Sequence, residues 1–247
     1  MKILVSNDDG IFSPGLTALA EAAAEFGEVM IFAPDFEQSA VSHAITIQRP
    51  LKYTPVKILK GFECYRVNGT PADCVAMGLY HWGGADLVLS GINLGSNLGS
   101  DIWHSGTVAA AKQGVLLGVR AAAFSQGIPG EQTGYDPQKP FLKEILRMLV
   151  EEPMPTLVNV NFPANPRGML WTHQSVRAYN GKLIEGQDPA GRKHYWLSAT
   201  PLTEPDENSD RWALDHDLVS ITPLRLSLTD DEWLAQRRQL LIQDAVR

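Results

Sequence analysis

The chain has 247 residues, a formal net charge of −7 and 44% hydrophobic residues, a composition typical of a globular protein rather than a disordered one. Its acidic balance argues against binding to duplex nucleic acid, which requires a basic face. It has no apolar stretch near the length of about 18 residues that a membrane-spanning helix needs, no targeting signal, and two cysteines, too few for a disulfide framework. We therefore expect a cytoplasmic protein that does not bind a membrane.

The start of the chain predicts a β-α-β unit. Residues 2–6 form a short apolar run typical of a buried strand. Ser13 and Pro14 then suit the N-cap and the first position of a helix, and Gly27 suits its C-cap. A second apolar run at 29–32 predicts the next strand, which implies a parallel, right-handed crossover.

The alternation of strands and helices continues beyond this unit. Thr70 suits an N-cap, Pro71 the first helical position and Asp73 the partner residue of a capping box. In chain order we expect a strand at 65–67, a helix at 71–81, a strand at 87–89, a helix at 105–117, a strand at 119–124, a helix at 138–150 and a strand at 156–161. The pattern predicts an α/β fold with a doubly wound, mostly parallel sheet and helices on both faces, in three layers like a Rossmann fold.

Residues 163–247 differ from the core, which we place at about 1–162 of a single α/β domain. They contain short β-like runs with no helical pattern between them, at 169–173, 193–198 and 218–222. We expect β-hairpins here that extend the main sheet or contact another subunit. A terminal helix is expected at 229–245, with Thr229 as its N-cap and Glu232 as the capping-box partner.

Oxygen-bearing side chains follow three of the predicted strands. In an open α/β sheet, ligands bind beyond the carboxyl ends of the strands, near the point where the strand order reverses. The candidates at these ends are Asn7, Asp8, Asp9, Asp35, Gln38, Ser39, Ser90, Asn93 and Asn97. Oxygen ligands without thiols suit a hard divalent cation such as Mg²⁺ or Mn²⁺.

The adjacent carboxylates Asp8 and Asp9 are the sharpest single feature of this set. Two neighbouring carboxylates repel each other unless a cation or a proton compensates their charge. A metal site explains the pair, but an Asp-Gly turn in solvent explains it as well. The spacing alone leaves both interpretations open.

A Gly- and Asn-rich loop leads to a predicted helix that starts at Ser105-Gly106-Thr107. Free backbone N–H groups at a helix start attract anions, and Gly106 would let a phosphate approach closely. Simple N-capping by a hydroxyl residue is the alternative. A long polar loop inside a compact domain is typical of a binding loop, which favours the phosphate interpretation.

His43 and His104 lie near these segments in the sequence. Each is a candidate for a catalytic or transition-state-stabilising role, with an ordinary structural histidine as the alternative. The chain lacks a GxxxxGK[ST] motif, a GxGxxG motif after the first strand and a GxSxG motif. These absences exclude a Walker-A nucleotidase, a dinucleotide-binding domain and an α/β-hydrolase.

The quoted motifs resemble those of the SurE (survival protein E) nucleotidase family. The similar segments are ILVSNDDG at 3–10, APD…S at 33–39, VNGTPADCV at 67–75, SGINLGSNLGSD…SGTVAAA at 90–111, NVNFP at 159–163 and VSITPL at 219–224. The resemblance implies a metal-dependent phosphatase that acts on nucleoside 5′- or 3′-monophosphates, and in some members on short polyphosphates. It also implies a homodimer or homotetramer assembled through the C-terminal region.

The resemblance further assigns roles to individual residues. It places one divalent cation (Mg, Mn or Co) on Asp8, Asp9, Ser39 and Asn93. It places phosphate contacts on Asn97, Ser105, Gly106 and Thr107. Asp8 or Asp9 would orient or deprotonate the attacking water, and Asn97 would stabilise the phosphoryl oxygens. Many relatives carry tyrosine where this chain has His104, so either that position tolerates both residues or the pH dependence or substrate choice differs here. We also expect His43 and His104 to take part in substrate binding.

A receiver-type signalling module is the alternative from a different class, since it also opens with an apolar strand, an acidic pair and bound Mg²⁺. Against it, Gly91 stands where the phosphate-accepting aspartate should be, and the chain is about twice the usual receiver length. A broader acid-type phosphatase or exopolyphosphatase is the alternative within the phosphatases. An aspartyl-phosphate enzyme is disfavoured because Asn7 occupies the nucleophile position.

Overall fold

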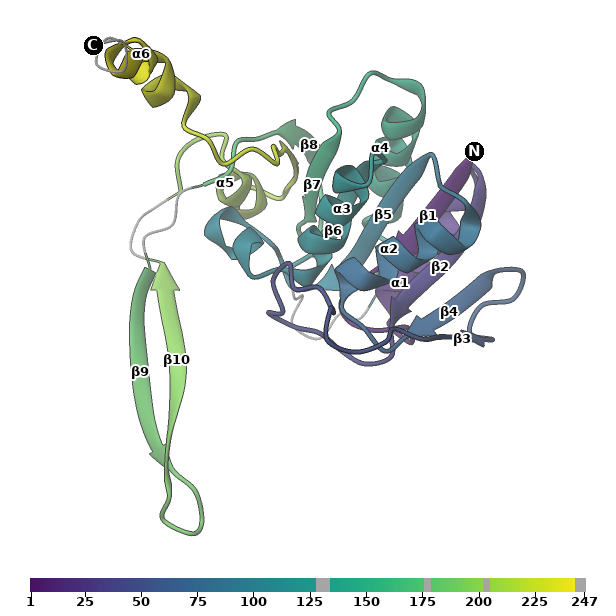
Figure 1. Ribbon diagram of the computed structural model, residues 1–247, viewed down its shortest axis with the longest axis horizontal. Coiled ribbons are helices and arrows are strands. Elements are labelled where there is room, and N and C mark those ends of the chain that lie inside the picture. The colour runs from purple at the N-terminus through teal and green to yellow at the C-terminus, as the bar shows by residue number, and fades with distance from the viewer. Residues whose placement is uncertain (128–133, 176–178, 202–204, 243–247) are drawn as a thin grey trace.

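The structure is a computed structural model that describes residues 1–127, 134–175, 179–201 and 205–242 (Figure 1). Within these ranges the main sheet has nine strands in the order β3-β4-β2-β1-β5-β6-β7-β11-β8. Their bounds are β1 (Lys2–Ser6), β2 (Glu28–Pro34), β3 (Tyr53–Val56), β4 (Glu63–Val67), β5 (Leu87–Leu94), β6 (Arg120–Gln126), β7 (Leu157–Phe162), β8 (Gly168–Trp171) and β11 (Leu218–Pro223). The strands from β4 to β7 in this order are parallel, whereas β3 and β11 run antiparallel to β4 and β7.

Helices cover both faces of the sheet and complete three layers (Figure 1). Helices α1 (Pro14–Ala23) and α4 (Lys139–Glu151) pack on one face, and α2 (Pro71–Trp82) and α3 (Gly106–Leu116) pack on the other. Each face has its own apolar core, because successive residues of a strand point to opposite sides. In β5, Leu87 and Leu89 join one core and Val88 joins the other. The predicted doubly wound α/β fold is confirmed.

The predicted start of α2 is also confirmed. The Thr70 hydroxyl accepts a hydrogen bond from the Asp73 N–H at 3.2 Å, and Asp73 Oδ2 accepts one from the Thr70 N–H at 2.9 Å. This capping box satisfies two of the N–H groups that a helix start leaves unpaired. The predicted C-cap of α1 at Gly27 is wrong, since the helix ends at Ala23 and Ala24 is its C-cap.

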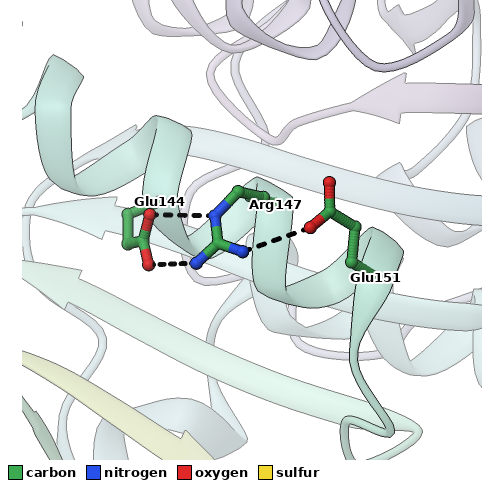
Figure 2. Close-up of polar contacts among 3 residues, drawn as sticks. All are labelled: Glu144, Arg147 and Glu151. Carbon is green, nitrogen blue, oxygen red and sulfur yellow. Dashed lines mark hydrogen bonds and ion pairs between the residues drawn. The ribbon is translucent and has the colours of Figure 1, made fainter.

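Helix α4 shows how the sequence separates a buried face from a charged one. Leu142, Ile145, Leu146 and Leu149 are buried. On the exposed side, Arg147 binds Glu144 one turn before it and Glu151 one turn after it, and Figure 2 shows the guanidinium group between the two carboxylates. Pairs at these spacings stabilise a helix locally. The bonds from Arg147 also lower the pKa of Glu144.

The prediction of β-hairpins after residue 163 is only partly correct. The segments at 169–173 and 218–222 become β8 and β11, which are paired in parallel and extend the main sheet beyond β7. Strands β9 (Tyr179–Gln187) and β10 (Lys193–Pro201) do form an antiparallel hairpin, which projects away from the main sheet (Figure 1). β9 itself was not expected, because it lacks a clear apolar alternation.

Three more elements differ from expectation. Helix α5 (Asp210–Asp215) is too short to show a helical period, and η1 (Gly99–Trp103), a 3₁₀ helix, lies within the expected polar loop. Helix α6 (Asp231–Ile242) is present, but Asp230 caps it in place of Thr229, since Asp230 Oδ1 accepts from the Trp233 N–H at 2.9 Å. None of the helices in the described ranges is long and apolar enough to cross a membrane.

Candidate functional site

The strand order reverses between β1 and β5, because the sheet continues through β2 on one side and through β6 on the other. Asp8 and Asp9 follow the end of β1 after one intervening residue, and Asn93 lies near the carboxyl end of β5. The two strands are in register, with Ser6 opposite Ser90. The candidate residues therefore gather at the position where open α/β sheets bind their ligands.

Asp8 lies against the first turn of α3 and is only 5% exposed. The Thr107 hydroxyl donates a hydrogen bond to Asp8 Oδ1. Burial raises the pKa of Asp8, and hydrogen bonds from Thr107 and Gly106 partly oppose that increase. A Cβ atom on Gly106 would lie 2.8 Å from the Cβ atom of Asp8, so the close approach of helix and carboxylate requires glycine there.

The first turn of α3 therefore performs two of the functions considered for it. The Ser105 hydroxyl accepts from the Val108 N–H at 3.1 Å, which confirms N-capping at this position. Gly106 and Thr107 instead face an anion, namely the carboxylate of Asp8. The start of α3 thus does stabilise negative charge, as a helix N-terminus should. Phosphate binding by the same groups stays a prediction.

Asp9 is the second carboxylate of the site. Burial, the charge of Asp8 and, to a smaller extent, the charge of Glu37 raise the pKa of Asp9 to about 6. Its Oδ2 accepts a hydrogen bond from the Leu94 N–H at 3.2 Å, which connects β1 to the end of β5. Glu37 was not among the predicted residues, and it also accepts a hydrogen bond from the Ser39 hydroxyl at 2.5 Å.

The donor atoms fit a hard divalent cation. Described residues include no group of three or more His, Cys, Asp or Glu side chains placed to hold a metal, so a cation here would need neutral oxygen ligands as well. Ser39 and Asn93 carry such oxygens, and the bond from Asn93 Nδ2 to the Gly95 carbonyl (2.7 Å) uses the amide nitrogen and leaves the amide oxygen available. Burial is the main cause of the raised pKa values of Asp8 and Asp9, and the charge of Asp8 adds to it at Asp9, so a bound cation would offset the cost of ionising the pair.

Three buried oxygen atoms beside the carboxylates add to this polar environment. Ser6 Oγ, Asn7 Oδ1 and Ser90 Oγ have no hydrogen-bond partner within the described part of the chain. Buried polar atoms are normally satisfied by protein or ordered water. Buried oxygen atoms without a protein partner are positions that an ordered water molecule can satisfy.

Asn97 is buried and its backbone is fixed from β7. Its N–H donates to Asn161 Oδ1 at 2.8 Å, and its carbonyl accepts from Asn161 Nδ2 at 3.0 Å and from Asn159 Nδ2 at 2.8 Å. Its side-chain Nδ2 donates to Ser125 Oγ at 2.8 Å. Asn159 and Asn161 were missed as site residues. Their spacing of two within an otherwise apolar strand places both on one side of the sheet, and this was the available signal.

The two predicted histidines lie next to η1 and α3, since His104 is the C-cap of η1 and His43 contacts α3. His43 Nε2 pairs with Gln113 Oε1 of α3 at 2.8 Å and borders a cavity of about 390 Å³ that Trp103 and Lys112 also line. His104 is exposed, and its carbonyl accepts from the Ser42 N–H at 3.0 Å. A substrate contact by either imidazole stays a prediction.

Tyr135 is a further neighbour of the carboxylates that the sequence did not indicate. Burial and then the charge of Asp9 raise the pKa of its phenol. Its hydroxyl lies so close to α1 that a Cβ atom on Gly15 would come within 2.7 Å of it. No motif accompanies Tyr135 in the sequence, so no signal was available for it.

Comparison with known proteins connects this geometry to one family. Residues 3–181 match the family model described as survival protein SurE. A protein named 5′-nucleotidase SurE 1 from Thermus thermophilus is 47% identical over 246 residues, which cover 98% of each chain. A protein named 5′-nucleotidase SurE from Deinococcus radiodurans is 42% identical over 249 residues, covering 97% of this chain and 92% of that one.

A solved structure agrees with the sequence comparisons. The crystal structure of the SurE protein from Aquifex aeolicus superimposes with a TM-score of 0.83 and 38% sequence identity. The alignment covers 97% of this chain and 99% of that chain. The similarity therefore extends over the main sheet and also over the part that follows residue 163.

Proposed function

The chain belongs to the SurE family, and from that membership we propose that it is a 5′-nucleotidase, a phosphoric monoester hydrolase that converts nucleoside 5′-monophosphates to nucleoside and phosphate. The relatives from T. thermophilus and D. radiodurans carry that name. The observation that carries the proposal is the buried carboxylate of Asp8, which lies beside Asp9 at the first turn of α3. An acidic pair next to a helix N-terminus can hold a cation and a phosphate side by side.

We propose that activity depends on one divalent cation, Mg²⁺, Mn²⁺ or Co²⁺. Its ligands would be Asp8, Asp9, Ser39 and Asn93. When bound, the cation would polarise a phosphoryl oxygen and lower the pKa of a bound water. The Ser39 hydroxyl donates its proton to Glu37 Oε1, which leaves the lone pairs of Ser39 Oγ available to ligate the cation.

The chain's own groups have separate tasks in this proposal. Asp8 and Asp9 orient the attacking water, and one of them accepts its proton. Asn97 and the first N–H groups of α3 bind the phosphoryl oxygens as their charge redistributes. Asn97 suits this task because Asn159 and Asn161 already hold its backbone, so little motion is needed during the reaction. His43 and His104 would contact the substrate near η1.

Phosphate release from a panel of substrates tests the proposal. The panel contains 5′- and 3′-nucleoside monophosphates and tripolyphosphate, each with Mg²⁺, Mn²⁺, Co²⁺ or EDTA. We expect release from 5′-monophosphates that EDTA and the Asp8→Asn substitution abolish. Full activity of the Asp8→Asn variant would refute the proposed site. The 3′-nucleotide and tripolyphosphate reactions measure the breadth of the activity.

The receiver-type alternative makes a different prediction in the same preparation. A receiver keeps the phosphate of acetyl phosphate on an aspartate, whereas a phosphatase releases it. The family membership favours release. Retention of labelled phosphate by the intact protein would favour the receiver instead.

We also propose that the protein is a homodimer or homotetramer whose subunits meet through residues 163–247. The β9–β10 hairpin stands apart from the main sheet (Figure 1), and an isolated two-stranded hairpin is at best marginally stable in water. It exposes large apolar side chains, Leu183, Ile184, Tyr195 and Trp196.

The buried free thiols Cys64 and Cys74 fit a reducing compartment, and we propose the cytoplasm.

A further inference from the structure

Asp210, the first residue of α5, is completely buried although it carries a carboxylate. Its Oδ2 accepts a hydrogen bond from the Gly99 N–H at 2.8 Å, and its Oδ1 accepts one from the Ser175 N–H at 3.0 Å. The Arg211 N–H also donates to Oδ1, at 2.8 Å. Burying an ionised group is costly unless hydrogen bonds compensate it, and backbone donors from three segments do so here.

The backbone carbonyl of Gly99 is hydrogen-bonded as well as its N–H group. Gln174 Nε2 donates to the Gly99 carbonyl at 2.9 Å. The backbone φ of Gly99 is +52°, and a Cβ atom there would lie 2.7 Å from the carbonyl oxygen of Ser175. Gln174, Ser175 and Asp210 thus pack tightly around the first residue of η1.

Capping of α5 does not explain why Asp210 is present. The N-cap of α5 is Ser209, whose hydroxyl accepts from the Trp212 N–H at 3.2 Å. Asp210 directs one carboxylate oxygen away from its own helix, to Gly99, which lies 111 residues earlier in the chain. A buried side chain that bridges such distant segments fixes their relative position.

Gly99 lies between two parts of the proposed phosphate site. Asn97 precedes it by two residues, and η1 connects it to the N-terminus of α3 at Ser105. Asn161 of β7 holds the backbone of Asn97, and Asp210 of α5 holds that of Gly99. These two anchors leave the 97–105 loop little freedom to change the direction of its backbone.

We propose that Asp210 is a positioning residue for phosphate binding, acting through Gly99 to hold the 97–105 loop in its binding geometry. The inference rests on the proposed nucleotidase function and deepens it. It gives the region after residue 163 a second function. Besides contacting another subunit, that region would fix the backbone of the loop that binds phosphate. Asp210 does not touch the substrate in this arrangement.

The test compares Asp210→Asn with Asp215→Asn in the full-length protein. Asp215 is an exposed residue of the same helix, so it serves as the matched control. The asparagine keeps the shape of Asp210 but presents an N–H₂ group to one of the backbone donors, so at least one charge-assisted bond is lost. We expect the KM for nucleoside monophosphate and the Ki of inorganic phosphate to rise about tenfold or more.

Two further readouts separate positioning from a general loss of stability. The apparent affinity for Mn²⁺ should change by less than about twofold, because Asp8 and Asp9 are untouched. Hydrogen exchange should accelerate in peptides that cover residues 97–105 and stay unchanged in α2. Gln174→Ala removes the bond to the Gly99 carbonyl and should produce the same changes to a smaller degree. This variant replaces Asp210→Asn as the test of the proposal if Asp210→Asn fails to fold.

The outcomes distinguish this inference from the proposed function. If the wild-type protein released no phosphate, the proposed function would fail, and faster exchange at residues 97–105 in Asp210→Asn would show that the loop is still held as described. If KM, Ki and exchange at 97–105 all matched the Asp215→Asn control, the positioning role of Asp210 would be wrong. If Asp210→Asn does not fold, unchanged KM, Ki and exchange in Gln174→Ala would overturn the proposal instead.

Discussion

The hydroxyl group of Thr107 donates a hydrogen bond to Oδ1 of Asp8, and this contact joins the first turn of α3 to the end of β1. It connects residues 99 positions apart, at the point where the strand order of the sheet reverses. Because the bond uses only one carboxylate oxygen, it fixes the orientation of Asp8 and leaves Oδ2 toward Gly106. The proposed cation and phosphate positions both depend on this orientation.

The substitution Thr107→Val tests that dependence, since valine has the shape of threonine without the hydroxyl. A hydrogen bond to a charged group contributes about 1.5–3 kcal/mol, so we expect kcat/KM for a nucleoside 5′-monophosphate to fall by about 10- to 100-fold. Loss of the bond should also raise the pKa of Asp8 further, because Thr107 opposes the effect of burial. Thr107→Ser keeps the hydroxyl and should retain most of the activity. Equal activity of the valine and serine variants would contradict the proposal.

Asp9→Asn should stabilise the protein when divalent cations are removed. The pKa of Asp9 in the folded protein is about 6, above its ordinary value of 3.8, so protonation favours the folded state. The stabilisation from protonated Asp9 is present below pH 4 and is lost as the pH rises through 6. At pH 8 in EDTA we therefore expect the variant to be more stable by about 1–2 kcal/mol, a figure reduced because the side chain is partly exposed.

Thermal denaturation at several pH values measures this difference. The advantage of Asp9→Asn should disappear near pH 4, where the wild-type carboxyl is protonated as well. Adding Mn²⁺ at pH 8 should raise the Tm of the wild type and have little effect on the variant. A wild-type protein that is more stable than the variant at pH 8 in EDTA would show that ionised Asp9 does not destabilise the folded protein.

Much of the main sheet was predictable, because parallel strands covered on both faces are continuous apolar runs. The helix starts carry local signals as well, such as Thr70 with Asp73. The position of Asp8 and Asp9 followed from the rule that ligands bind where strand order reverses. These features depend on neighbours in the sequence or on the general geometry of the fold.

The rest of the site depends on contacts between distant segments, which leave no local pattern. Asn161 binds Asn97 across 64 positions, and Asp210 binds Gly99 across 111. Glu37 and Tyr135 reach Asp9 only through the folded geometry. Strand β3 was missed because it is an exposed edge strand that contains Pro55, a residue that disfavours strand prediction.

Gly106→Ala should damage the site through a steric clash. The added Cβ atom would lie 2.8 Å from Asp8 Cβ and 2.9 Å from Oδ2, so α3 and β1 must separate. Overpacking of this kind costs about 1–3 kcal/mol, and we expect both a lower Tm and a large loss of kcat/KM. Gly134→Ala is the matched control, since nothing lies within 4 Å of its added Cβ atom. An active Gly106→Ala enzyme would contradict the tight packing of α3 against Asp8.

The hairpin provides the test of subunit assembly. Ile184 and Trp196 are directly opposite each other in the β9–β10 register, so they lie on the same face, and Trp196 is 68% exposed. Exposed apolar pairs of this size are typical of a surface that another subunit covers. We expect the double substitution of Ile184→Ser and Trp196→Ser to convert the oligomer to monomers, measured as the molar mass by light scattering after size-exclusion chromatography. Glu185→Gln alters the same hairpin without removing apolar surface and should keep the wild-type mass. A monomeric wild-type protein, or an unchanged mass in the double variant, would show that the hairpin does not hold the subunits together.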